Sequence, residues 1–155
     1  LNTRFKGGEA AYVLRKSGAR MLFLANDFLD TNYAEMLRST LAETGDDLAD
    51  LDRVVVLSGD VGTDTAWSDY LAAGESVSEA DAMARIDAIH GDDLADIMFT
   101  SGTTGHPKGA MSTHAQNLRV YEVWSEVVGL RARVATLCAK RPLYEGFRGY
   151  TTYVA

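Results

Sequence analysis

The apolar residues of the chain follow two alternating patterns, helical spacing and short continuous runs. The first helical pattern extends from about Gly8 to Lys16, and Ser17-Gly18 supplies a stop signal after it. Its apolar side consists of Ala11, Tyr12, Val13 and Leu14. The run over 20–25 is short and apolar from its second residue on. Such a run is typical of a strand that is buried on both faces.

The same alternation continues along the chain. Helical spacing over 31–43 precedes the glycine at position 45 and a second candidate for a buried strand over 54–57. A loop at 58–65 then leads into a short helical pattern at 66–72, which contains Trp67 and Tyr70. These two aromatics could form a stacking platform for a ring, but their helical spacing favours a packing role.

Four further elements are predicted after residue 77, the last of which is a strand over 134–139. A helix over 78–89 has Ser78 as its cap and an inward apolar side made of Met83, Ile86 and Ile89. The segment 92–99 ends in a short stretch compatible with a strand. Ser112 or Thr113 can cap a helix that continues to about Val128. Helices that alternate with strands indicate an α/β fold, a layered sheet with helices packed on it.

Composition and charge restrict the class of protein. The chain has 155 residues, of which 46% are hydrophobic and 24% charged, as in a soluble globular domain with one ordinary core. Its net charge of −7 argues against general affinity for nucleic acid or anionic membranes. Cys138 has no second cysteine to pair with, so a reducing, cytoplasmic location is expected. No long apolar span is present, which leaves peripheral membrane contact as the most that is expected.

The acidic residues Asp46, Asp47, Asp50 and Asp52 could in principle bind a divalent cation. Their spacing lacks the glycine and the closing glutamate of an EF-hand loop, so a solvated connection is the preferred interpretation.

The chemistry of the chain is concentrated in Thr100–Gly109, which reads T-S-G-T-T-G-H-P-K-G. Its three glycines allow the backbone to approach a ligand so that successive N–H groups converge on an anion. Four hydroxyl side chains can donate to phosphate oxygens, and Lys108 adds one positive charge. Pro107 restricts the direction in which this lysine leaves the loop. The segment is therefore predicted to hold phosphate.

Two other interpretations of the segment are weaker. A Walker A loop requires G-x-x-x-x-G-K-[ST], whereas Lys108 here is followed by Gly109 and preceded by Pro107. A flexible Gly/Ser/Thr linker would have no need of an ordered Pro-Lys-Gly after its glycines.

The stretch T-S-G-T-T-G-H-P-K-G resembles the ATP phosphate loop of the adenylate-forming superfamily, which includes acyl-CoA synthetases, aryl-CoA ligases, luciferases and the adenylation domains of peptide synthetases. This resemblance implies that the loop grips the β- and γ-phosphates of ATP, with Mg²⁺ sharing their charge. CoA and a small carboxylic acid would be the other substrates. The residues implied for ATP binding are Thr100, Ser101, Gly102, Thr103, Thr104, Gly105 and Lys108.

The resemblance extends over the rest of the chain. The start of the sequence, the D-D-x-A-x-I-x-F approach to the loop and the pair Thr113-His114 are similar to superfamily segments, and His114 is expected to brace the loop. Pro142–Phe147 resembles the stretch that approaches the acyl substrate, but Glu145 stands where a histidine is usual. We therefore assign Glu145 no catalytic role.

The resemblance implies that residues 1–155 form part of the N-terminal domain of a larger enzyme, without its C-terminal domain. The expected function is that of an acyl-CoA synthetase for a fatty acid, and the chain alone is expected to bind nucleotide weakly and turn over little. Three alternatives remain open: a non-catalytic nucleotide-binding or structural piece, an adenylation domain for an aryl or amino acid, and another phosphate-binding enzyme such as a kinase.

Overall fold

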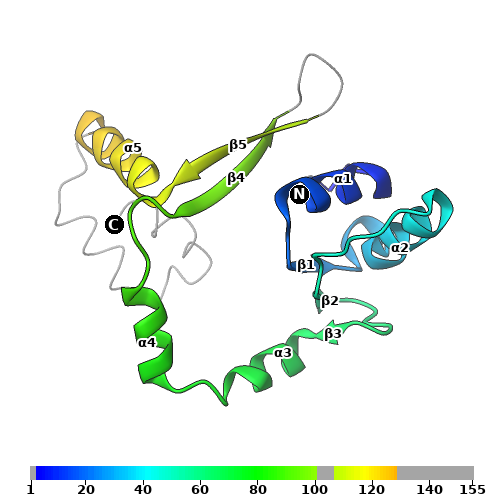
Figure 1. Ribbon diagram of the computed structural model, residues 1–155. Helices are drawn as coiled ribbons and strands as arrows, with labels where there is room; N and C mark the ends of the chain where they lie inside the picture. Colours follow the sequence, from blue (N-terminus) through cyan, green and yellow to red (C-terminus); the bar gives the residue numbers. More distant parts are fainter. Residues whose placement is uncertain (1–2, 101–106, 129–155) are drawn as a thin grey trace. The chain divides into compact units, whose positions relative to one another are not determined.

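The structure is a computed structural model that describes residues 3–100 and 107–128. Its elements are α1 (Gly7–Ser17), β1 (Met21–Ala25), the 3₁₀ helix η1 (Phe28–Asp30), α2 (Tyr33–Thr44), β2 (Arg53–Ser58), β3 (Thr65–Ala66), α3 (Trp67–Gly74), α4 (Glu79–Asp87), β4 (Leu94–Thr100), β5 (Lys108–Thr113) and α5 (His114–Val127) (Figure 1). The chain divides into two compact units, which we describe separately. The first comprises Leu1–Asp87 with Phe99–Gly109, and the second Ala88–Met98 with Ala110–Ala155.

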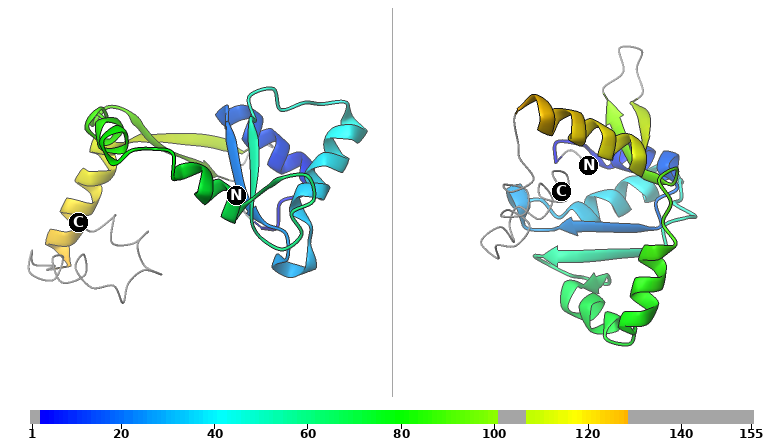
Figure 2. Two further views of the ribbon diagram at one scale, coloured as in Figure 1. Left: turned by 90° about the horizontal axis from the view of Figure 1, so that it is seen from below. Right: turned by 90° about the vertical axis from the view of Figure 1, so that its left-hand side faces the viewer.

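The first unit contains a parallel sheet with the strand order β1-β2-β3. Met21 pairs with Arg53 at the start of β1, and Val55 pairs with Thr65 of β3. Helices α1 and α2 lie on one side of β1 and β2 (Figure 2). Parallel strands need a crossover connection, and α2 supplies the one between β1 and β2. The predicted α/β fold is confirmed.

The core of this unit lies between α1 and α2. Ala11, Leu14 and Leu37 form its buried cluster, and Leu22 and Leu41 pack against it. The two helices approach closely at Gly7, because a Cβ placed there would lie 2.7 Å from Thr40 Cβ and 2.8 Å from the Met36 carbonyl oxygen. Only a residue without a side chain fits this crossing.

The predicted stops of α1 and α2 are confirmed, whereas α1 begins one residue before its predicted start and α2 two residues after. Gly18 and Gly45 follow α1 and α2 with φ values of 63° and 67°, the left-handed conformation that ends a helix. At the start of α2, the Asn32 side chain accepts a hydrogen bond from the Glu35 N–H at 3.0 Å.

The two predicted strands form, but neither is buried along its whole predicted length, and Leu57 at the end of the run in β2 is 46% exposed. Val55 and Val56 of β2 are 0% and 1% exposed. Phe23 in the middle of β1 is 43% exposed, so the prediction that β1 is buried on both faces is wrong. The reason is its place at the edge of the described sheet, where α1 and α2 cover only one side.

Asn26 joins the carboxyl ends of β1 and β2. Its side chain donates to the Asp60 carbonyl at 2.6 Å and accepts from the Ala34 N–H at 3.0 Å, while its backbone N–H donates to the Ser58 carbonyl at 2.9 Å. The residue is only 7% exposed, and both ends of its amide have partners. It therefore ties the start of α2 to the loop that follows β2.

The aromatic residues of α3 pack on one another, in agreement with their predicted role. Trp67 and Tyr70 stack with centroids 5.7 Å apart, and Phe23 of β1 meets both rings edge-on.

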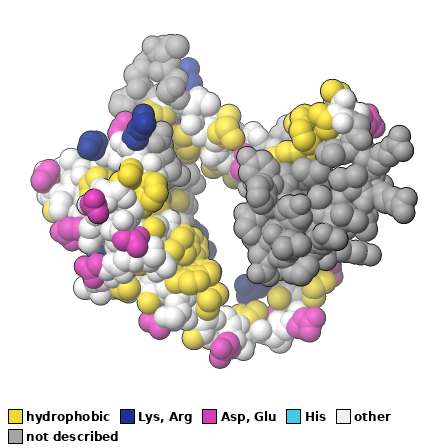
Figure 3. Space-filling view, turned by 180° about the vertical axis from the view of Figure 1, so that it is seen from behind, with side chains coloured by type: hydrophobic (Ala, Val, Ile, Leu, Met, Phe, Trp, Pro, Cys, Tyr) yellow, Lys and Arg dark blue, Asp and Glu magenta, His cyan; other side chains and the backbone are white. Residues whose placement is uncertain are grey.

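The α4 prediction is correct in its cap and wrong in its burial. The Asp81 N–H donates to Ser78 Oγ at 3.1 Å, as a cap requires. Met83, Ile86 and Ile89 were expected to face inward, but they are 48%, 58% and 52% exposed. Helical spacing places such residues on one face without determining what covers it. Hydrophobic side chains are also visible elsewhere on the described surface (Figure 3).

In the second unit, α5 begins where the sequence predicts. Thr113 Oγ1 accepts from the Gln116 N–H at 3.3 Å, and the Gln116 side chain accepts from the Thr113 N–H at 3.0 Å, which completes a capping box. The His114 N–H donates to the Asp93 carbonyl at 3.1 Å, and Asn117 donates to Asp96 at 2.5 Å. These bonds hold the start of α5 to the segment around the beginning of β4.

Strands β4 and β5 form a two-stranded sheet and run in opposite directions (Figure 1). Strand β5 is not predicted from the sequence, because K-G-A-M-S-T has neither alternating polarity nor a continuous apolar run. None of the described helices is long and apolar enough to cross a membrane. The predicted strand over 134–139, Cys138 and the segment Pro142–Phe147 with Glu145 lie outside the described residues.

Candidate functional site

The two described ends of the predicted phosphate loop lie on paired strands. Thr100 is the last residue of β4 and Lys108 is the first residue of β5. Both residues are exposed. The pairing of β4 with β5 therefore brings a hydroxyl and a positive charge to the same end of the two-stranded sheet. The other predicted ligands, Ser101, Gly102, Thr103, Thr104 and Gly105, lie outside the described residues.

A side-chain bond reinforces this junction. Thr100 Oγ1 donates to the Lys108 carbonyl at 3.5 Å, a long and weak hydrogen bond. Lys108 begins β5, so its backbone is extended, and its carbonyl accepts from a side chain of β4. The strand therefore restrains the backbone of Lys108, whereas the residue itself is exposed.

A second bond reaches this junction from α1. Tyr12 Oη donates to the Pro107 carbonyl at 3.1 Å, across 95 positions of sequence. Tyr12 and Pro107 are both half-buried and belong to the same compact unit. The sequence predicts Tyr12 only as part of an apolar helix side. No local pattern could have revealed this contact, because periodicity carries no information on residues so far apart.

His114 is the first residue of α5 and is half-buried. Its backbone contact with Asp93 lies within the second unit. That its side chain braces the loop stays a prediction.

The acidic stretch considered as a cation site contributes to ion pairs. Asp46 lies 3.2 Å from Arg15, and Asp52 lies 2.6 Å from Arg20. Within residues 3–100 and 107–128, no group of three or more His, Cys, Asp or Glu residues is placed to hold a metal ion.

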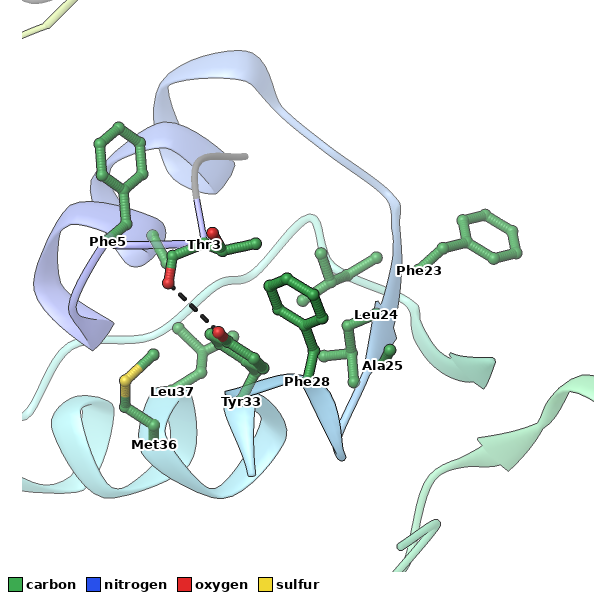
Figure 4. A pocket seen from close by; sticks show the side chains of 11 residues that line it. Thr3, Phe5, Phe23, Leu24, Ala25, Phe28, Tyr33, Met36 and Leu37 are labelled. Atoms are coloured by element: carbon green, nitrogen blue, oxygen red, sulfur yellow. Dashed lines mark hydrogen bonds between the residues drawn. The ribbon is translucent and has the colours of Figure 1, made fainter. Parts of the chain in front are cut away.

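The first unit also contains an apolar pocket with a volume of about 240 Å³ (Figure 4). It lies between the N-terminal segment, β1 and α2, and Tyr33 donates to the Thr3 carbonyl at 3.2 Å on its wall. Its lining residues are Thr3, Phe5, Ala10, Leu22, Phe23, Leu24, Ala25, Phe28, Tyr33, Met36 and Leu37. Neither Thr100 nor Lys108 is among them, so we treat the pocket and the loop as separate features.

The sequence of the chain matches a known protein family. The sequence model of the family described as "AMP-binding enzyme" matches residues 1–154. The chain belongs to this family. The match covers both compact units and includes the whole of the predicted phosphate loop, residues 100–109.

Two curated members of the AMP-binding enzymes illustrate the range of relatives. The 3-[(3aS,4S,7aS)-7a-methyl-1,5-dioxo-octahydro-1H-inden-4-yl]propanoyl:CoA ligase of Rhodococcus jostii (strain RHA1) is 37% identical over 128 residues, which are 81% of this chain and 24% of that protein. The long-chain-fatty-acid–CoA ligase FadD15 of Mycobacterium tuberculosis is 33% identical over 132 residues, which are 85% of this chain and 19% of that protein. The chain thus spans about a quarter or less of the length of these relatives.

A solved structure from the same group of enzymes has a similar fold. The anthranilate CoA ligase AuaEII, crystallised in complex with anthranoyl-AMP, matches with a TM-score of 0.59 at 25% identity. The match covers 81% of this chain and 21% of the ligase. The arrangement of helices and strands described above is therefore that of a segment of this larger fold.

Proposed function

We propose that the protein is an acyl-CoA synthetase in which this chain supplies the ATP phosphate loop. The observation that carries the proposal is the junction of β4 and β5, where Thr100 and Lys108 meet at the two ends of a glycine- and hydroxyl-rich loop. Membership in the AMP-binding enzyme family and the CoA ligases among the relatives support it.

The proposed reaction has two steps. An oxygen of the substrate carboxylate attacks the α-phosphorus of ATP, and the bond to the β-phosphate oxygen breaks to release pyrophosphate. The thiol of CoA then attacks the acyl carbon and displaces AMP, which leaves the thioester. In the first step negative charge grows on the departing pyrophosphate, and this charge must be offset for the step to be fast.

The loop residues are proposed to offset this charge. Lys108 would place its ammonium group against the β- and γ-phosphates. The Thr100 hydroxyl has a single proton, so on ATP binding it would exchange its long bond to the Lys108 carbonyl for one to a phosphate oxygen. Ser101, Thr103 and Thr104 would add hydroxyl donors, and the backbone at Gly102 and Gly105 would allow close approach. Mg²⁺ would arrive with ATP and share the charge of its phosphates. We assign it no protein ligand.

The acid is proposed to be a fatty acid. This choice is supported by the likeness to the long-chain-fatty-acid–CoA ligase. The relatives named for a ring-bearing propanoyl substrate and for anthranilate make a cyclic or aryl acid the alternative. Pyrophosphate exchange measured with a panel of fatty, cyclic and aryl acids on an enzyme that contains this chain would distinguish these classes.

The role of the loop is tested by binding of MgATP to the chain. We expect Lys108→Ala to raise the Kd about tenfold, because a hydrogen bond to a charged group contributes roughly 1.5–3 kcal/mol and this lysine, being exposed, belongs at the low end. Lys16→Ala is the matched control, since it removes one positive charge from the exposed last turn of α1. Equal binding by the two variants would refute the proposal.

A second test concerns the chain by itself. It spans about a quarter or less of its relatives, and we expect it to bind MgATP weakly and to form little acyl-adenylate alone. Rapid pyrophosphate exchange by the 155-residue chain would contradict this expectation.

A further inference from the structure

We propose that Tyr12 is a positioning residue that sets the direction in which Lys108 leaves the phosphate loop. The inference rests on the proposed function, because it assigns Tyr12 a task in ATP binding through Lys108. Its basis is the hydrogen bond from Tyr12 Oη to the Pro107 carbonyl at 3.1 Å.

The donor, Tyr12, belongs to a firmly held helix. Tyr12 lies in the middle of α1, between the buried residues Ala11 and Val13. Helix α1 is capped at both ends, by Glu9 accepting from the Lys6 N–H at 2.9 Å and by the left-handed Gly18. It is also packed closely against α2 at Gly7. The tyrosine hydroxyl therefore extends from an element that cannot easily shift.

The orientation of the acceptor, the Pro107 carbonyl, also determines that of the N–H that follows it. A trans peptide is planar, so its carbonyl and the N–H of the next residue point in opposite directions. A donor that holds the Pro107 carbonyl therefore also sets the orientation of the Lys108 N–H. The proline ring restricts φ on the other side of this carbonyl. Together these restraints limit rotation of the peptide plane that leads into Lys108.

The backbone is also restrained on the other side of the lysine. The Lys108 carbonyl accepts from Thr100 Oγ1 at 3.5 Å, and Lys108 starts β5. The backbone of Lys108 is thus restrained before the residue by Tyr12 and after it by Thr100 and the strand. The Lys108 side chain is itself exposed, so its backbone is what the fold can position. Restraining this backbone in advance reduces the conformational freedom that the lysine must lose when it binds phosphate.

The test compares two tyrosines that each donate to a backbone carbonyl. Tyr12→Phe removes the bond to Pro107, and the control Tyr33→Phe removes the bond to the Thr3 carbonyl at 3.2 Å. We expect Tyr12→Phe to raise the Kd of the chain for MgATP about three- to tenfold, the range of one hydrogen bond. Tyr33→Phe is expected to change it less than about twofold, since its bond lies away from the loop.

Two readouts separate positioning from a general loss of stability. In a Lys108→Ala background, Tyr12→Phe is expected to change the Kd less than about twofold, because its effect acts through the missing lysine. In the ligand-free chain, the carbonyl ¹³C shift of Pro107 should move in Tyr12→Phe and stay unchanged in Tyr33→Phe.

The outcomes distinguish this inference from the proposed function. If Lys108→Ala weakens MgATP binding and Tyr12→Phe does not, the role of Tyr12 is wrong and the loop assignment stands. If Tyr12→Phe weakens binding equally with and without Lys108, the tyrosine does not act through the lysine. If neither Lys108→Ala nor Tyr12→Phe weakens MgATP binding, the loop assignment is wrong, and the role of Tyr12 is wrong with it.

Discussion

Replacing Gly7 by alanine tests the packing on which α1 depends. The added Cβ would overlap the Thr40 hydroxyl and would lie 2.7 Å from Thr40 Cβ and 2.8 Å from the Met36 carbonyl oxygen. Two of these three atoms cannot rotate away, because one is the Cβ of a helical residue and the other is backbone. The helices α1 and α2 must therefore separate until these distances reach an ordinary contact of at least 3.4 Å.

The cost of this separation can be estimated from the structure. Overpacking of a filled interface typically destabilises by about 1–3 kcal/mol. Here the separation also loosens the contact of Ala11 and Leu14 with Leu37, the buried cluster between the same helices. Gly8, the next residue, has no heavy atom within 4 Å of its own added Cβ. Gly8→Ala should therefore stabilise by about 0.4–1 kcal/mol through the lower entropy of the unfolded chain.

The assay is urea denaturation of the two variants and the original chain, followed by far-ultraviolet circular dichroism. We expect Gly7→Ala to have the lower free energy of unfolding, with a difference from Gly8→Ala of about 1.5–4 kcal/mol. Adding Thr40→Ala to Gly7→Ala should restore only part of the lost stability, because the Cβ at position 40 and the Met36 carbonyl remain. A Gly7→Ala chain as stable as Gly8→Ala would refute the close approach of the two helices.

Two further predictions concern buried polar groups, each measured by urea denaturation. Asn26→Ala leaves the Asp60 carbonyl and the Ala34 N–H without their partner and should destabilise by about 2–4 kcal/mol; a loss below about 1 kcal/mol would contradict its bridging role. Arg38→Met leaves the Asp64 carboxylate, whose side chain is 8% exposed, without its ion pair. The free energy of unfolding should fall by about 1–3 kcal/mol, less than for a fully buried pair, because Arg38 is itself 42% exposed. Adding Asp64→Asn should recover most of this loss, and no recovery would argue against an uncompensated charge as its cause.

The sequence by itself determines the helices of the first unit, because their signals are local. Helix α1 is recognisable from its apolar spacing and from Gly18, and the end of α2 from Gly45. A glycine in the left-handed conformation ends a helix whatever surrounds it. The phosphate loop could be predicted for the same reason, since its proposed chemistry lies in ten consecutive residues, Thr100–Gly109.

Which apolar residues are buried could not be predicted from such local signals. Met83, Ile86 and Ile89 share one face by their spacing, and the sequence predicts that this face is inward. They are exposed in the structure because burial depends on a second element, which periodicity does not specify. The same holds for Phe23, whose strand β1 forms the edge of the described sheet.

Tertiary structure alone decided the contacts that position the candidate site. Strand β5 exists because its backbone pairs with β4, although its sequence lacks a strand pattern. The bond between Tyr12 and Pro107 joins residues 95 positions apart, and the place of Gly7 against Thr40 depends on how two helices cross. Hydrophobic spacing and turn residues act over a few positions, whereas these contacts arise only when distant segments pack. The sequence therefore predicts the phosphate-binding chemistry, and the fold decides how the backbone of Lys108 is held.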